Sequence, residues 1–123
     1  MSQLVVSEIR RIIDQVANLN PDIIGCALVS EDGLPVYSVV PSAVEEDTVS
    51  AMSATLYALG ERVVSDLISG ELKQVYIKGD KGYVVISSVG ELGTLTVMAR
   101  SSVKLGYVLM ILRQVITEMT NLQ

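Results

Sequence analysis

The sequence predicts a single α+β domain, and three observations indicate it. The hydrophobic pattern changes along the chain in the order helix, two strands, long helix, three strands, helix. Short polar breaks that contain glycine separate the strand-like runs at residues 31–33, 79–82 and 90–93. The length of 123 residues suits one domain with one hydrophobic core, so we expect a single domain over 1–123.

The chain begins with an amphipathic helix and a hairpin. Apolar side chains recur at helical spacing over residues 3–19, and Pro21 ends the helix. Two strands are expected at 22–30 and 34–40, with Gly33 in the turn because that position requires positive φ. The first strand is almost continuously apolar, which favours a central strand covered on both faces.

A long helix is expected over residues 42–69. Ser42 and Glu45 form a capping-box pattern at its start, and Gly70 is a suitable terminator. The acidic residues that follow Ser42 suit the positive end of the helix dipole, and we interpret them as a cap rather than as a metal site.

This helix carries two apolar faces. One stripe is expected to lie on the sheet: Val49, Met52, Leu56, Leu59, Val63 and Leu67. A second strip, with small residues between its large ones, remains: Ser53, Ala54, Tyr57, Val64 and Ile68. A helix with two apolar faces needs two partners, so the second partner is expected to be another copy of the chain.

Three strands and a final helix complete the domain. The strands are expected at 72–78, 83–89 and 92–99, and lysines at both ends of the first suit the edge of a sheet. The last helix is expected to begin at Ser101 or Ser102 and to continue to about residue 120. Its inner face is apolar, as a helix that covers a sheet requires.

Composition excludes several classes of protein. A net charge of −5 argues against nucleic acid and anionic membranes as partners. No apolar run is long enough to span a bilayer, and the charges Glu8, Arg10 and Arg11 argue against a signal peptide. The single cysteine, Cys26, lies in an apolar strand, where we expect a buried thiol. We therefore expect a cytoplasmic protein without membrane insertion.

The chemistry of most enzymes is absent. The chain has no histidine, one cysteine and no glycine-rich phosphate-binding motif. Adjacent carboxylates occur only in the first hairpin turn and at the expected helix cap. We therefore expect no catalytic, cofactor-binding or metal-binding residue and no enzymatic activity, although composition alone leaves a Ser–Lys pair open.

Three segments in this order resemble the Roadblock/LC7 family. They are GCALVSEDGLPVY at 25–37, KQVYIKGDKGYVVI at 73–86, and SVKLGYV at 102–108, where Lys104 stands at a position more often occupied by asparagine. The resemblance extends over nearly the whole chain. It implies a five-stranded antiparallel sheet with the long helix on one face and the two terminal helices on the other.

The resemblance also implies a mode of assembly. Family members form homodimers by pairing the third strand with its copy and by packing their second helices together. Carried over to this chain, the expected dimer or partner interface comprises Ser53, Ala54, Tyr57, Glu61, Val64, Ile68, Lys73, Gln74, Val75, Tyr76 and Ile77.

Three functions are compatible with this pattern. The first is a homodimeric regulator or docking platform for a small Ras-like GTPase, as in the MglB-like branch of the family. Arg62 is the only arginine on the long helix and is not expected to act as an arginine finger. The second is a scaffold or dynein-light-chain-like adaptor that ignores nucleotide state. The third is a small-ligand sensor, which requires a ligand-sized cavity.

Overall fold

The computed structural model describes residues 2–123. Its helices are α1 (Gln3–Ala17), α2 (Glu46–Val63) and α3 (Leu105–Thr120), and its strands are β1 (Ile23–Val29), β2 (Pro35–Val39), β3 (Gln74–Lys78), β4 (Gly82–Ser88) and β5 (Thr94–Arg100). A π-helical segment, Val64–Ile68, continues α2, and a short 3-10 helix, Gly90–Leu92, connects β4 to β5. The order of elements is the predicted one.

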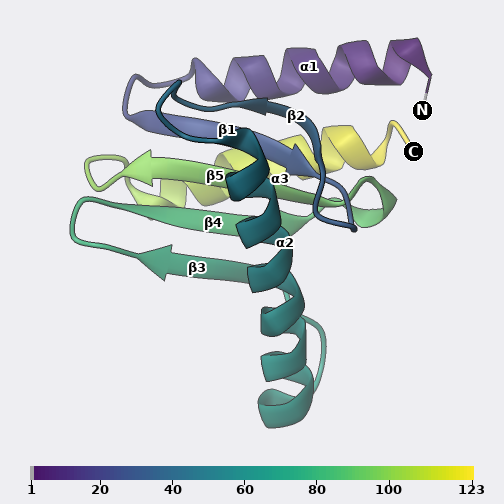
Figure 1. Ribbon diagram of the computed structural model, residues 1–123, viewed down its shortest axis with the longest axis vertical. Coiled ribbons are helices and arrows are strands. Elements are labelled where there is room, and N and C mark those ends of the chain that lie inside the picture. Colours follow the sequence, from purple (N-terminus) through teal and green to yellow (C-terminus); the bar gives the residue numbers. More distant parts are fainter. Residues whose placement is uncertain (1) are drawn as a thin grey trace.

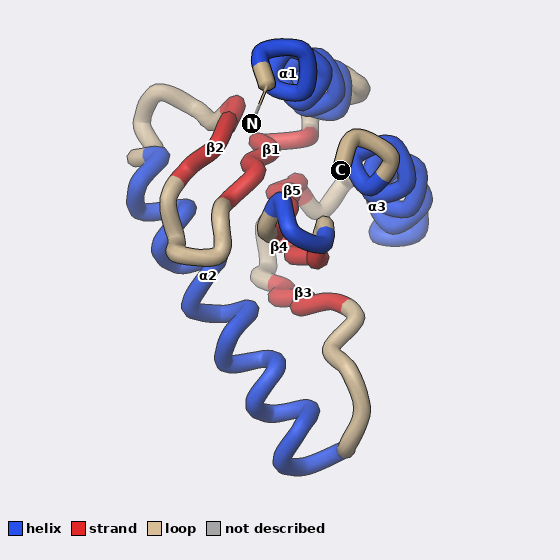
Figure 2. Tube along the Cα trace, turned by 90° about the vertical axis from the view of Figure 1, so that its right-hand side faces the viewer, coloured by secondary structure: helices blue, strands red, loops and turns tan. Residues whose placement is uncertain are grey.

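The five strands form one antiparallel sheet in the order β2-β1-β5-β4-β3. The apolar strand β1 lies inside the sheet and β3 lies at its edge, as expected. Figure 1 shows α2 crossing in front of the strands, and Figure 2 shows α1 and α3 together on the opposite face. This confirms the α+β architecture that the resemblance implies.

The main hydrophobic core lies between the sheet and the α1–α3 layer. Alternate residues of β1, β4 and β5 pack there against the apolar stripes of the two helices. Tyr83 enters this core from β4, and its hydroxyl donates a hydrogen bond to the Val103 carbonyl at 2.7 Å. The buried tyrosine is thereby satisfied, and it ties the sheet to the loop that precedes α3.

Two turns depend on glycine. Gly33 has a φ of 83° in the β1–β2 turn, in agreement with the sequence-based expectation. Gly93 has a φ of 120°, and a Cβ added there would overlap the carbonyl oxygen of Val29. Only glycine therefore allows β5 to start against the end of β1.

The predicted starts of α2 and α3 were wrong by a few residues, whereas α1 starts at Gln3 as expected. Glu45, not Ser42, is the N-cap of α2, because the Val44 amide bonds the Pro41 carbonyl in a preceding turn. Helix α3 starts after Lys104, and the Ser102 hydroxyl donates to Asp22 instead of capping the helix. Before α2 a backbone turn bond, and before α3 a tertiary side-chain bond, therefore replaces the cap that the local sequence favoured.

The predicted orientation of α2 was also wrong. The residues of α2 that are buried against the sheet are Ser50 and Ser53. Gly60 also faces this side, because a Cβ added there would lie 3.0 Å from side-chain atoms of Leu72 and Val75. Small residues on this side let α2 lie close to the strands. The large apolar side chains predicted to cover the sheet point elsewhere, and several of them are exposed.

Candidate functional site

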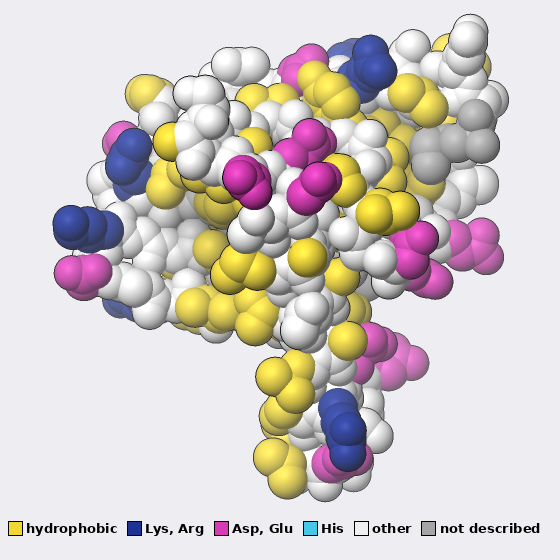
Figure 3. All heavy atoms as spheres, in the orientation of Figure 1, with side chains coloured by type: hydrophobic (Ala, Val, Ile, Leu, Met, Phe, Trp, Pro, Cys, Tyr) yellow, Lys and Arg dark blue, Asp and Glu magenta, His cyan; other side chains and the backbone are white. Residues whose placement is uncertain are grey.

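The exposed side of α2 is an apolar surface that the chain itself leaves uncovered. We define the α2 apolar surface by Met52, Leu59, Val63, Leu67 and Ile68, of which Met52 is 59% exposed, Leu59 56%, Leu67 79% and Ile68 70%. Figure 3 shows apolar side chains along the left side of the projecting part of α2 and over the neighbouring strands. Contiguous apolar surface of this kind marks a protein–protein interaction site.

The free edge of β3 adjoins this surface. β3 pairs with β4 on one side only, so its other side presents unpaired backbone donors and acceptors. Tyr76 and Ile77 are exposed on it, and the Tyr76 ring makes an edge-to-face contact with Tyr83 at 5.8 Å between centroids. Figure 1 shows α2 continuing past β3, so the overhanging turns have no sheet beneath them.

The structure divides the predicted interface residues between several environments. Ser53 is 3% exposed and accepts a hydrogen bond from the Thr96 hydroxyl at 2.9 Å, so it faces its own sheet. The remaining residues are at least partly accessible in one copy of the chain: Ala54, Tyr57, Glu61, Val64, Ile68, Lys73, Gln74, Val75, Tyr76 and Ile77. Of these, Ile68, Tyr76 and Ile77 belong to the apolar surface or to the β3 edge beside it.

Sequence reasoning missed four members of the α2 apolar surface because it assigned them to the sheet: Met52, Leu59, Val63 and Leu67. The spacing of Ser50, Ser53 and Gly60 could have corrected this. These small residues recur on one side of the helix, and a helix that packs closely on a sheet presents its small side chains there.

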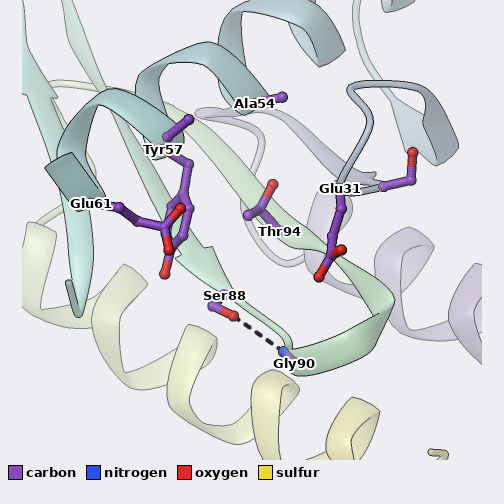
Figure 4. Close-up of a pocket in the computed structure, with 10 residues that line it drawn as sticks. Glu31, Ala54, Tyr57, Glu61, Ser88, Gly90 and Thr94 are labelled. Carbon is purple, nitrogen blue, oxygen red and sulfur yellow. Dashed lines mark hydrogen bonds between the residues drawn. The ribbon is translucent and has the colours of Figure 1, made fainter. Parts of the chain in front are cut away.

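A pocket of about 380 Å³ opens on the other side of α2. Figure 4 shows Tyr57 and Glu61 reaching from the helix toward Ser88, with Glu31 across the opening. The Ser88 hydroxyl accepts a hydrogen bond from the Gly90 amide at 3.2 Å. No lysine or arginine lines this pocket, so its electrostatic character is acidic.

The structure shows the surroundings of Tyr57, Cys26 and Arg62. Burial raises the pKa of Tyr57, the Ser88 hydroxyl opposes the rise, and the carboxylates of Glu61 and Glu71 add to it, so the phenol stays neutral. Burial raises the pKa of the Cys26 thiol to about 12, which leaves no thiolate to act as nucleophile. Arg62 is exposed and lies 3.6 Å from Asp66 in an ion pair along the helix.

Two further features concern metals and membranes. Within residues 2–123, no group of three or more His, Cys, Asp or Glu side chains is arranged to hold a metal ion. Over the same range, no helix has the length and apolar character needed to cross a membrane.

The Roadblock/LC7 domain model matches residues 12–99. MJ0310, an uncharacterized protein of Methanocaldococcus jannaschii, is 32% identical over 91 residues, which cover 74% of this chain and 79% of the relative.

Solved structures agree with this match in fold. Myxococcus xanthus MglB has a TM-score of 0.87 at 17% identity and covers 98% of this chain and 91% of its own. A structure of MglB with a tetrameric arrangement has a TM-score of 0.83 at 11% identity, over 99% of this chain and 92% of its own. At such identities the likeness concerns the fold alone.

Proposed function

Since this chain belongs to the Roadblock/LC7 domain family, we propose that it is a homodimeric docking platform that regulates a small Ras-like GTPase in the cytoplasm. The observation that carries the proposal is the α2 apolar surface beside the free edge of β3. One copy of the chain buries neither feature. Proteins of this family are regulatory or adaptor proteins, and the resemblance of the sequence to the MglB-like branch, whose fold the chain shares, favours regulation of a GTPase.

A two-fold dimer satisfies both features at once. Antiparallel pairing of β3 with the partner's β3 supplies the missing hydrogen bonds and joins two five-stranded sheets into one. The turns of α2 that extend past β3 then lie over the partner, where Leu67 and Ile68 leave water. Lys73 and Lys78 lie at the two ends of the strand, where lysines discourage indiscriminate pairing with other exposed strands.

The chain contributes positioning rather than catalytic groups to the GTPase. Arg62, the only arginine on α2, already pairs with Asp66 and lies on the solvated side. Any stimulation of hydrolysis therefore acts by ordering the GTPase's own catalytic residues. In this role the platform must bind the GTP-bound and GDP-bound states of its partner with different affinities. A protein that binds both states equally well cannot shift the equilibrium between them.

Binding of the purified full chain to a small Ras-like GTPase from the same organism tests the proposal. The GTPase is loaded with either GDP or a non-hydrolysable GTP analogue, and affinity is measured by calorimetry alongside single-turnover GTP hydrolysis. We expect one nucleotide state to bind at least about tenfold more tightly, a difference of about 1.4 kcal/mol. Equal affinity for both states would indicate the adaptor function, and no binding by any such GTPase would refute the proposal.

A further inference from the structure

A second groove lies on the face of the sheet opposite α2. It has a volume of about 510 Å³ and lies between the start of β3 and the outer side of α3. In Figure 2, α3 lies beside β4 and β5, and β3 lies at the edge of the sheet. The groove is within the size range of roughly 300–1,000 Å³ in which proteins hold small molecules.

The charge of this groove is opposite to that of the protein. Lys73 and Arg113 line it, and no carboxylate does, although the chain as a whole carries a net charge of −5. Among residues 2–123, Arg113 is also the only arginine without a carboxylate or aromatic partner. The partnered arginines are Arg10, which lies over the Tyr37 ring, and the ion-paired Arg11, Arg62 and Arg100. A guanidinium left free beside a lysine is suited to an oxyanion.

Ser87 provides a second, independent indication. The register of β4 with β3 pairs it with Gln74, and its side chain lines the groove. Ser87 is 2% exposed, yet its hydroxyl has no hydrogen-bond partner within residues 2–123. A buried hydroxyl without a partner costs free energy, so a native structure that keeps one calls for an explanation. An oxygen atom of a ligand in the groove would accept the Ser87 hydrogen bond.

Of the other six residues that line the groove, three are apolar, and three are polar, namely Gln74, Ser88 and Thr117. Leu72 from the loop before β3, with Leu109 and Ile116 from α3, provides aliphatic surface beside the two cations. A bare inorganic anion would leave this surface in contact with water. A ligand that carries its charge on an aliphatic body would contact both parts of the groove.

We propose that the α3–β3 groove binds a small amphipathic anion, namely a carboxylate or phosphate monoester on an aliphatic chain. Arg113 and Lys73 hold the oxyanion, Ser87 donates to it, and Leu72, Leu109 and Ile116 cover the aliphatic part. The site lies on the opposite face from the α2 apolar surface and does not depend on a GTPase partner. It would make the chain a ligand-responsive platform, since β3 contributes both to the groove and to the proposed dimer edge.

Titration of the isotope-labelled full chain, followed by amide chemical shifts, tests the site. The probes are sodium octanoate and octyl phosphate, with inorganic phosphate and octanol as the two partial ligands. We expect octanoate, octyl phosphate or both to shift the amides of Gln74, Ser87 and Arg113 in a saturable manner. Neither partial ligand is expected to bind as tightly, because each lacks one half of the recognised chemistry.

Substitutions distinguish binding at this site from nonspecific binding to the protein surface. Arg113→Gln is expected to weaken binding by about tenfold or more, since it removes a charged hydrogen-bond donor. Lys104→Gln removes the same charge just before α3, outside the groove, and is expected to leave the affinity unchanged. Arg113 is exposed, so its variant should fold normally, and circular dichroism checks this.

Several results would overturn the proposal. Absence of saturable shifts with both amphipathic anions at millimolar concentration would show that the groove is not a ligand site. Equal binding of octanol would make the cations irrelevant, and equal binding of inorganic phosphate would make the apolar lining irrelevant. Unchanged affinity in Arg113→Gln would remove the proposed anchor. None of these results bears on the mass of the dimer or on GTPase binding, so the two proposals fail separately.

Discussion

Leu59→Arg tests whether the α2 apolar surface is the contact between two copies of the chain. Full burial of a leucine side chain contributes about 1.5–3 kcal/mol, and Leu59 is 56% exposed in one copy. Covering the exposed part therefore contributes about 1–1.5 kcal/mol in each copy. A two-fold interface counts the residue twice, so its loss costs about 2–3 kcal/mol and raises the dimer dissociation constant about 30- to 150-fold.

The arginine adds a further penalty, because it places an unpaired charge at each Leu59 position of the interface. Sedimentation velocity over a concentration series measures the dissociation constant, and thermal unfolding by circular dichroism checks the fold. Ala58→Arg is the matched control, since Ala58 is exposed on the same helix but lines the pocket on the other side. If Leu59→Arg dimerises as tightly as the native chain, or if Ala58→Arg dissociates equally, the assignment of the contact surface is wrong.

Two further predictions concern the fold itself. Gly93→Ala should destabilise the protein by at least about 2 kcal/mol in urea unfolding, because a Cβ there meets the Val29 carbonyl at a φ of 120°. Gly106→Ala is its control: an added Cβ in α3 meets nothing within 4 Å, and the helix should gain up to about 1 kcal/mol. A similar loss in both variants would contradict the steric explanation. The buried Cys26 thiol, with its pKa raised to about 12, should react with a thiol reagent at pH 8 only as fast as the protein unfolds. Rapid labelling of the native protein would show that the thiol is accessible.

Local patterns predicted the succession of elements well. The strands lie within two residues of the expected bounds at each end, because alternation and glycine turns are read from neighbours in sequence. Gly33 and the edge position of β3 were likewise predictable, since a turn conformation and an exposed lysine-flanked strand leave local signals.

The faces of α2 were not predictable from hydrophobicity. The usual assumption assigns the largest apolar stripe to the core, whereas this helix places Ser50 and Ser53 on the sheet. The Ser50 hydroxyl donates a hydrogen bond to the Glu46 carbonyl at 2.9 Å, and the Ser53 hydroxyl accepts one from Thr96, so each of these buried hydroxyls has a hydrogen-bond partner. The apolar stripe is consequently free for a partner.

The two pockets could not be predicted from local sequence patterns either. The groove that contains Ser87 and Arg113 combines β4 with α3, and only the tertiary fold brings these segments together. The sequence does show that Arg113 has no acidic residue three or four positions away on its own helix. An arginine without an acidic neighbour on its helix is a weak indication of an anion site. Only the structure shows that Arg113 and the buried Ser87 line the same groove.

The mass of the native chain in solution is the most direct test of the claim that α2 exposes more apolar surface than one copy can cover. Light scattering coupled to size-exclusion chromatography, over micromolar concentrations, should give twice the monomer mass. A monomer at every concentration would contradict the claim, because the α2 apolar surface and the β3 edge would then remain in water without a partner of their own kind.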